Sequence, residues 1–212
     1  SIDDWIENLK KQKEAQEKYK KGMMQKIFSQ EIRFKDGNGN DYPEWEEKML
    51  GEIGTFFSGG TPLSTNKEYY NGTIPFIGSA DIYKPSVVNH ISEEAMTSSS
   101  AKLVHKGDLL YALYGANSGE VAISKISGAI NQAVLCIRTS ESVEYIYYLL
   151  LFYRVQIVSK YLQGGQGNLS ANIIKKLRIM VPVKEEQQKV ADFLSSIDDL
   201  INLTRQRITQ AE

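Results

Sequence analysis

The feature that most constrains the fold is a six-residue segment that occurs near both ends of the chain. Ser1-Ile2-Asp3-Asp4-Trp5-Ile6 opens the sequence, and Ser196-Ile197-Asp198-Asp199-Leu200-Ile201 repeats it with a change at the fifth position only. Each copy leads into residues with helical periodicity, so the repeated unit is predicted to be a helix. The chain is therefore expected to start inside one copy of a repeated element and to stop inside the next.

The first helix is predicted over residues 2 to about 29, because apolar residues recur at spacings of three and four without a proline. In its middle, Gln12, Lys13 and Gln16 stand where a coiled coil would place leucine. The basic run from Lys10 to Lys21 is interpreted as a solvated face. We therefore expect a helix that pairs with a partner helix. Its predicted buried stripe consists of Ile2, Trp5, Ile6, Leu9, Tyr19, Met23, Ile27 and Phe28.

The middle of the chain alternates short apolar runs with turns, which is typical of a sheet domain. Strands are predicted at 74–77, 87–91, 108–114, 133–138 and 179–183, and helices over 143–161 and near Ser170. A last helix begins at Lys184, with Val190, Leu194, Ile197 and Ile201 on its buried stripe. The expected fold class is α+β, with a mixed or antiparallel sheet and short helices flanked by two long helices. The predicted divisions are a helix at 1–30, a globular domain at 40–183 and a second helix at 184–212.

Composition narrows the classes of protein that fit. The 212 residues carry a net charge of −1, which counts against a strongly basic, stand-alone nucleic-acid binder. The sequence has no run of about 18 apolar residues, so no membrane span is predicted. Cys136 is the one cysteine, so it cannot form a disulfide framework, and with only His90 and His105 a structural zinc site is not expected. We expect a cytoplasmic protein, and the missing initiator methionine fits a fragment or a processed chain.

The sequence contains no assembled catalytic motif. It has neither a nucleophile and base in a known context, nor a glycine-rich cofactor loop, nor a zinc-binding helix motif. The remaining enzymatic hypothesis is a nuclease-type site at Glu185, Glu186 and Lys189, although adjacent acids on a helix are usually solvated. We therefore expect a protein without catalytic residues, metal or cofactor of its own.

Seven motifs in order resemble one family, the DNA specificity subunit of type I restriction–modification systems. Each motif is weak alone, but together they cover nearly the whole chain. Phe76 stands where the family often has tryptophan, and Val183-Lys184 where Pro-Pro or Pro-Leu is frequent. The motifs are Trp45 with Leu50-Gly51-Glu52-Ile53, Gly59-Gly60-Thr61-Pro62, Gly72-Thr73-Ile74-Pro75-Phe76, Lys106-Gly107-Asp108-Leu109-Leu110, Ala129-Ile130-Asn131-Gln132-Ala133, Gln166-Gly167-Asn168-Leu169-Ser170, and Val181-Pro182-Val183 with Glu186-Gln187-Gln188-Lys189-Val190.

The resemblance implies a non-catalytic subunit with two target recognition domains, each followed by a conserved helix, and two long helices that pair as an antiparallel coiled coil. It makes residues 1–30 the spacer and dimerisation helix, 40–183 the target recognition domain and 184–212 the second, truncated helix. This chain resembles the second half, and would read one half of a bipartite duplex target. Implied partners are methyltransferase subunits, which use S-adenosylmethionine and would dock on the helices, and ATP-dependent restriction subunits. A homodimer through the helices is a further implied assembly. A helix of about 28 residues is about 42 Å long and would hold two reading heads a little more than one duplex turn apart.

Candidate DNA contacts are polar residues on loops, since base edges and phosphates are read by such side chains. Gly60, Thr61, Asn168 and Ser170 are assigned to phosphate contact. The loop candidates for base edges are Lys67, Tyr69 and Tyr70; Ser79, Asp81, Tyr83 and Lys84; Tyr114, Asn117 and Ser118; and Gln163 and Gln166. The alternatives are a helix-mediated interaction scaffold without a nucleic-acid role and an enzyme, either a nuclease or a fused methylase. Steep salt dependence of DNA binding would separate the recognition role from the scaffold.

Overall fold

The computed structural model describes residues 2–162 and 168–212, which form two compact units. Residues 2–46 and 181–212 make the helix unit, and residues 47–180, as far as they are described, make the sheet domain. The helix unit contains α1 (Ile2–Phe28) and α5 (Lys184–Ala211). Within the described ranges, no helix combines the length and apolar character that a membrane span requires.

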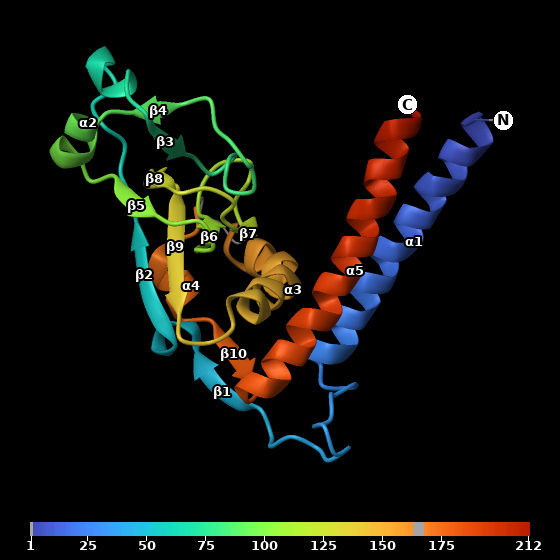
Figure 1. Ribbon diagram of the computed structural model, residues 1–212. Coiled ribbons are helices and arrows are strands. Elements are labelled where there is room, and N and C mark those ends of the chain that lie inside the picture. The colour runs from blue at the N-terminus through green and yellow to red at the C-terminus, as the bar shows by residue number, and fades with distance from the viewer. Residues whose placement is uncertain (1, 163–167) are drawn as a thin grey trace. The chain divides into compact units, whose positions relative to one another are not determined.

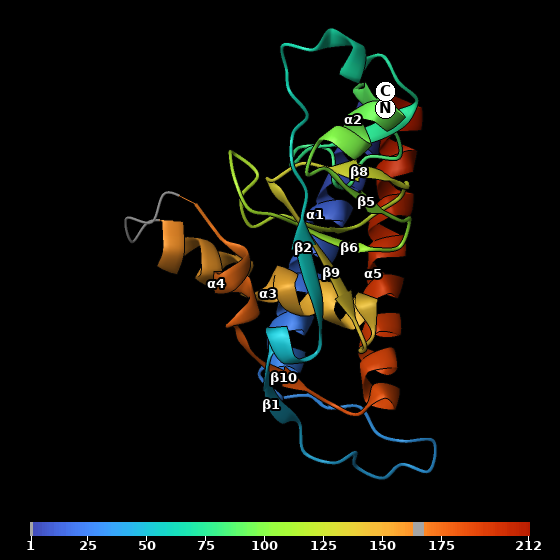
Figure 2. The same ribbon diagram turned by 90° about the vertical axis from the view of Figure 1, so that its left-hand side faces the viewer.

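Helices α1 and α5 lie side by side and run antiparallel, with their free ends together (Figures 1 and 2). Two ion pairs fix the register: Lys20 Nζ lies 2.7 Å from Asp198 Oδ1, and Lys10 Nζ lies 2.8 Å from Glu212 Oε1. As the residue number rises along α1, the number of the partner residue on α5 falls, so the two helices are antiparallel. The predicted antiparallel pairing of two long helices is confirmed.

The buried stripe of α5 follows a strict alternation of three and four residues. The predicted residues Val190, Leu194, Ile197 and Ile201 are all buried, and the stripe continues at Thr204 and Ile208. This is the repeat that keeps one face of a helix against a partner along its whole length. Thr204 turns its hydroxyl to the carbonyl of Leu200 at 3.0 Å, which satisfies its hydrogen bond inside the seam.

The stripe predicted on α1 is partly wrong. Ile2, Trp5 and Tyr19 are 68%, 51% and 55% exposed. Pairing with α5 selects a face that repeats every three and four residues, and this face passes through polar positions in place of those three apolar ones. The seam of α1 consists of the buried Leu9, Met24, Ile27 and Phe28 and the half-buried Ile6, Lys13, Gln16, Lys20 and Met23.

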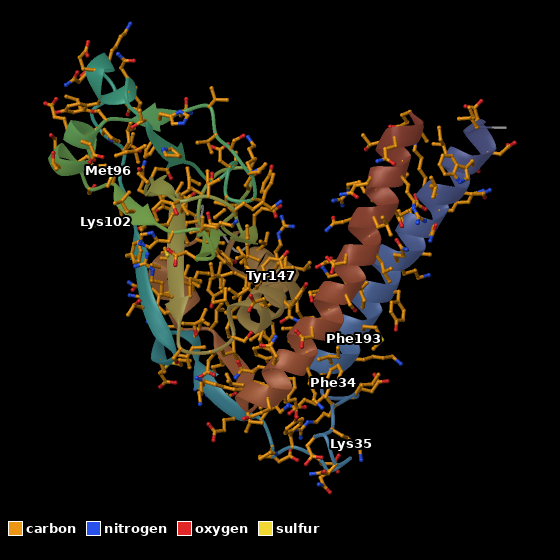
Figure 3. The ribbon with its side chains drawn as sticks, viewed as in Figure 1. Phe34, Lys35, Met96, Lys102, Tyr147 and Phe193 are labelled. Atoms are coloured by element: carbon orange, nitrogen blue, oxygen red, sulfur yellow. The ribbon has the colours of Figure 1, made fainter. Side chains whose placement is uncertain are left out.

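A buried carboxylate stabilises the end of the helix unit where α1 ends and α5 begins, which we call the closed end. Glu186, in the first turn of α5, is fully buried; its Oε2 accepts hydrogen bonds from Arg33 Nη2 at 2.8 Å and from Trp45 Nε1 at 3.0 Å. The next residue, Gln187, donates from Nε2 to the carbonyl of Pro182 at 2.8 Å. Close by in the chain, Phe34 meets Phe193 edge to face (Figure 3). These contacts explain why a carboxylate and an amide stand where α5 begins.

The sheet domain contains ten strands in the described residues, arranged in three sheets. One four-stranded sheet has the order β2-β9-β6-β7, a second has the order β4-β3-β8-β5, and β1 pairs with β10. The pair β3 and β8 is parallel, whereas β2–β9, β6–β9, β6–β7, β3–β4 and β5–β8 are antiparallel. The strands are β1 (Glu46–Met49), β2 (Gly54–Ser58), β3 (Ile74–Ile77), β4 (His90–Ile91), β5 (Lys102–Val104), β6 (Leu109–Ala112), β7 (Val121–Ile123), β8 (Gly128–Ile130), β9 (Val134–Thr139) and β10 (Arg178–Val181).

In its described residues the sheet domain also has three α-helices: α2 (Glu93–Ser98), α3 (Val143–Leu162) and α4 (Ala171–Lys175). Short 3₁₀ turns occupy Leu50–Glu52 and Lys67–Tyr70. The expected α+β class with a mixed sheet is confirmed. One predicted strand, 87–91, is largely wrong, since only its last two residues pair and Val88 is 94% exposed.

The core lies between the two four-stranded sheets. Ile77 and Ile130 of one sheet pack in a single buried cluster with Leu110, Val134 and Cys136 of the other. Cys136 is fully buried, as expected for an inert thiol, and burial raises its pKa to about 12. Packing of two apolar faces therefore fixes the relation between the sheets, and with it the positions at which their strands end.

Candidate nucleic-acid interface

The segments that follow four strands emerge at one edge of the sheets. Strands β2 and β6 both end beside the start of β9, where their last residues pair with Leu135 and Val134. Strands β3 and β8 run parallel and end together, with Ile77 opposite Ile130. We call this region the loop edge, and its segments are 59–70, 78–89, 113–120 and 131–133.

The segment 131–133 joins these loops through backbone hydrogen bonds. The carbonyl of Asn131 accepts from the amide of Gly59 at 3.2 Å, and its amide donates to Ile77 at 3.4 Å. The carbonyl of Ala133 accepts from Leu113 at 2.8 Å. Asn131 Oδ1 also accepts from the amide of Ala133 at 2.9 Å, which folds the segment onto itself. Three loops are thus held to one short connection between β8 and β9.

The glycine pair at the end of β2 is a close-packed turn. A Cβ on Gly59 would overlap the carbonyl oxygen of Ile130, and one on Gly60 would overlap Ser100 Oγ. Only glycine allows this approach without moving backbone. Gly60 is buried, whereas Thr61 is exposed. The turn therefore sets where Thr61 stands on the loop edge.

In the first loop, the three predicted contact residues are not equivalent. Tyr70 donates its hydroxyl to the carbonyl of Pro62 at 2.7 Å and meets Phe76 edge to face. Tyr69 is half-buried and packs against the apolar cluster that contains Phe76. Lys67 is exposed. Lys67 thus remains the residue of this group that is open to a ligand, while the tyrosines support the loop.

The second loop is tied down by a carboxylate. Asp81 pairs with Lys84 at 2.7 Å, and this hydrogen bond raises the pKa of the lysine. The carbonyl of Ser79 accepts from Asn117 Nδ2 at 3.4 Å, which joins the second loop to the segment after β6. Tyr83 is 51% exposed. The structure therefore brings Ser79, Asp81, Lys84 and Asn117 together, and leaves the Tyr83 ring outward.

The segment after β6 is a loop, as predicted. The Ser118 hydroxyl is buried within it, 3.2 Å from the carbonyl of Leu113 and 2.8 Å from that of Gly115. Tyr114 is half-buried. Ser118 therefore holds the loop's shape, and Asn117 is the polar side chain that reaches a neighbouring loop.

The described part of the third predicted loop also reaches the loop edge. The amide of Leu169 donates to the carbonyl of Leu113 at 3.2 Å, with Asn168 exposed beside it. Ser170 Oγ accepts from the amide of Ile173 at 3.3 Å, so this residue is the N-cap of α4, as predicted. Two residues predicted in this loop lie outside the described residues: Gln163 and Gln166.

Gln132 was not among the predicted contact residues, although its motif was recognised. It is exposed on the loop edge, and its Oε1 accepts a hydrogen bond from Thr61 Oγ1 at 2.7 Å. The partners are 71 residues apart, so nothing local in the sequence predicts their meeting. The signal that could have found Gln132 is a polar Asn-Gln pair between two apolar strands.

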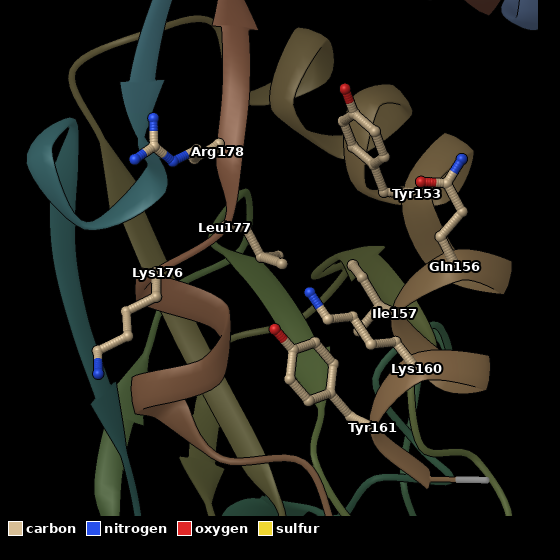
Figure 4. A pocket seen from close by; sticks show the side chains of 8 residues that line it. All are labelled: Tyr153, Gln156, Ile157, Lys160, Tyr161, Lys176, Leu177 and Arg178. Atoms are coloured by element: carbon tan, nitrogen blue, oxygen red, sulfur yellow. The ribbon is translucent and has the colours of Figure 1, made fainter. Parts of the chain in front are cut away.

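A separate pocket of about 340 Å³ lies on α3 and the segment before β10 (Figure 4). Lys160 stacks over the ring of Tyr161, with its Nζ 5.3 Å from the ring centroid. Lys176 and Arg178 extend away from Tyr161, and Arg178 pairs with Glu47. Because these cations do not converge, the pocket lacks the geometry of an anion site.

The nuclease hypothesis fails on the environment of its central residue. Glu186 is enclosed by Arg33 and Trp45, and Lys189 Nζ donates to the carbonyl of Lys35 at 2.6 Å. A carboxylate held in this way is structural and has no face open to a metal ion. In the described part of the chain, no group of three or more metal-ligating side chains comes together.

These features define a class of protein. They describe a sheet domain that presents anchored polar loops at one edge, in one chain with an antiparallel helix pair. Residues 42–212 match the family model described as the type I restriction modification DNA specificity domain. The chain belongs to this family, and the resemblance read from its motifs is confirmed.

Curated relatives agree with the family match. The chain is 34% identical over 188 residues to the type I restriction enzyme MjaIX specificity subunit of Methanocaldococcus jannaschii, covering 82% of this chain and 43% of the relative. It is 30% identical over 182 residues to the EcoR124I/EcoR124II specificity subunit of Escherichia coli, covering 81% and 44%. The chain thus spans less than half the length of these relatives.

Solved structures support the fold. The type I restriction–modification S subunit of M. genitalium superposes with a TM-score of 0.69 at 16% identity, over 99% of this chain and 54% of that one. The HsdS subunit of Thermoanaerobacter tengcongensis gives 0.66 at 20% identity, over 98% and 51%. The arrangement of helices and sheets is therefore shared with proteins about twice as long.

Proposed function

We propose that this chain recognises one half of a bipartite DNA target as part of the specificity subunit of a type I restriction–modification complex. The observation that carries the proposal is the loop edge, where loops far apart in sequence are anchored to the segment 131–133. Recognition of base edges needs polar side chains held in fixed positions by a rigid scaffold. The family match over residues 42–212 supports DNA as the ligand.

The contact residues are proposed in two groups. Contact with base edges is assigned to side chains that are exposed or that reach between loops: Lys67, Tyr83, Lys84 and Asn117. Phosphate contact, which positions a protein without reading sequence, is assigned to Asn168 and to the part of the loop edge that surrounds Thr61. The other predicted residues of the loop edge support these: Gly60, Tyr69, Tyr70, Ser79, Asp81, Tyr114, Ser118 and Ser170.

We assign the helix unit to spacing and assembly. The repeat of the opening hexapeptide at residues 196–201 supports a place in the second half of a two-domain subunit, with 1–30 as the central helix, 40–183 as the recognition domain and 184–212 as the distal helix. Helix α1 spans about 40 Å at about 1.5 Å per residue, which exceeds one duplex turn of about 34 Å. The helices would dock methyltransferase subunits in the cytoplasm. S-adenosylmethionine and ATP would be bound by the methyltransferase and restriction subunits, outside this chain.

The decisive experiment is to co-express the chain with the methyltransferase of its system and map adenine methylation across the host genome. Two short half-sites separated by a fixed gap are the expected result. A symmetric motif would indicate a homodimer of this chain, and an asymmetric one a subunit with two different domains. A stable complex that leaves the genome unmethylated would contradict the proposal and favour the interaction scaffold.

Two engineered chains separate the two parts of the proposal. Exchange of residues 63–170 for those of a relative should change one half-site and leave the gap unchanged. Insertion of four residues into α1 adds about 6 Å, which corresponds to roughly two base pairs, and should lengthen the gap alone. Altered half-sites after the insertion would contradict the idea that helix length sets the spacing.

A further inference from the structure

We infer that Gln132 is a phosphate-contacting residue of the loop edge, and that Thr61 acts through it as a positioning residue. The inference rests on the proposed function and names a residue that the motif analysis did not assign. It is carried by the hydrogen bond between Thr61 Oγ1 and Gln132 Oε1, at 2.7 Å.

The first step is the direction of this hydrogen bond. A threonine hydroxyl has one hydrogen to donate, and here Gln132 Oε1 receives it. The Thr61 hydroxyl hydrogen is therefore already used and does not reach a phosphate. The same bond fixes which end of the Gln132 amide faces outward, because its oxygen is turned toward Thr61. The Nε2 group, with two hydrogens, has no protein partner among the described residues.

The second step is the rigidity of the backbone beneath this side chain. Gln132 stands between Asn131 and Ala133, whose carbonyls accept from Gly59 and Leu113. The Asn131 side chain closes the turn on the amide of Ala133 at 2.9 Å. Both the backbone and the amide end of Gln132 are thus positioned before any ligand arrives, which reduces the entropy lost on binding.

The third step decides between a phosphate and a base. A glutamine that reads adenine does so with two hydrogen bonds, one from its nitrogen and one to its oxygen. In this protein the Gln132 oxygen is turned toward Thr61 and already accepts from it, so the group presented outward is the donor Nε2. Phosphate oxygens are acceptors only, and they take a large share of the hydrogen bonds in protein–DNA interfaces. A neutral donor on a rigid turn therefore fits the DNA backbone.

The test compares Gln132→Ala with Gln132→Glu in the full chain assembled with its methyltransferase, using duplexes with and without the target. Glutamate keeps an oxygen for Thr61 but replaces the outward NH₂ with an anionic oxygen. We expect about tenfold weaker binding for alanine and about a further tenfold for glutamate, equally on both duplexes, with an unchanged methylation motif. Gln156→Glu, an exposed glutamine of α3 with the same change of charge, is the matched control.

Thr61 supplies the positioning test. Thr61→Val should weaken DNA binding about threefold, Thr61→Ser should restore it, and Thr61→Val should have no further effect in the Gln132→Ala chain. Two results would overturn the inference while the proposed function stands. One is a Gln132→Glu chain that binds DNA as tightly as the Gln132→Ala chain, and the other is a methylation motif that relaxes at one base pair. A wild-type complex that binds no DNA would overturn both.

Discussion

The helix unit and the sheet domain bury different kinds of polar group. In the described residues of the sheet domain the buried polar groups are hydroxyls: Ser118 and Ser124 each bond to a nearby carbonyl, and the fully buried Tyr111 has a hydroxyl without a hydrogen-bond partner there. The helix unit instead buries Glu186 and Gln187 at its closed end and Thr204 in its seam. A carboxylate and an amide are thus buried in the helix unit, whereas the described part of the sheet domain leaves its charged side chains at the surface.

This contrast follows from what each unit must determine. Two apolar helix stripes can slide past each other by a turn, and a buried polar contact removes the alternative registers. A sheet has its register fixed by strand pairing and by which face is buried, so it needs no such device. Four changes in the protein test the contrast.

The largest effect is expected from Glu186→Ala in the helix unit. This change removes a fully buried carboxylate together with the hydrogen bonds that Arg33 and Trp45 Nε1 donate to it. Breaking a buried ion pair from one side costs about 3–5 kcal/mol. Hydrogen exchange should show faster opening of α1 and α5 and unchanged protection of β6 and β9. Glu185→Ala, which alters the exposed neighbour, should leave both units as they are.

A smaller loss is expected from Gly59→Ala in the sheet domain. The added methyl group would overlap the carbonyl oxygen of Ile130, and relief requires movement of the backbone beneath the loop edge. Overpacking of this kind costs about 1–3 kcal/mol. Urea denaturation measures this loss of stability, and hydrogen-exchange protection of β8 and β9 locates it. Gly22→Ala in α1, where an added Cβ meets nothing within 4 Å, should instead stabilise the helix unit by about 0.5–1 kcal/mol.

A gain of about 1 kcal/mol is expected from Gln16→Leu. Gln16 Oε1 is buried in the seam without a hydrogen-bond partner, and a buried unsatisfied acceptor is costly. The variant should raise the thermal midpoint of the helix unit, as measured by circular dichroism. If Gln16 specifies register, the same variant should also show more than one helix pairing in cysteine crosslinking between α1 and α5. A single register in the variant would assign that role to the Lys20–Asp198 pair instead.

The smallest effect concerns Asp108 in the sheet domain. Burial raises its pKa, but hydrogen bonds from Arg138 and from the amide of His105 outweigh burial and hold the pKa below 3.8. Because the folded pKa is depressed, the stabilisation is present above about pH 4 and is lost as pH falls through the folded value. Arg138 is 41% exposed, so the contribution should stay below about 1 kcal/mol. The difference in stability between wild type and Asp108→Asn should shrink below pH 4.

The sequence predicted those parts of the fold that local spacing controls. Val190, Leu194 and Ile197 were placed correctly on α5, because a stripe with spacings of three and four is visible in one helix alone. Trp5 and Tyr19 were misplaced because the partner helix, and not their own hydrophobicity, decides which face of α1 is buried.

The loop edge was predicted only as a set of separate loops. The short strand β8 has three residues, one of them a glycine, so it gives no periodic signal, yet it pairs with β3 and β5. The contact between Thr61 and Gln132 joins loops that follow different strands in different sheets. Such contacts depend on the whole topology, which is why Gln132 was recognised as part of a motif but not as a site residue.

The pairing of β1 with β10 has a consequence for how the domain is made in the cell. The amide of Leu50 donates to the carbonyl of Leu177, and Arg178 pairs with Glu47. The first strand of the domain, β1, therefore cannot pair until the last strand, β10, has been synthesised. Contacts between residues so far apart form slowly, since a long loop must close first. During synthesis, β1 can therefore find its partner strand only after residue 181 has left the ribosome, so this two-stranded sheet is a late-forming part of the domain.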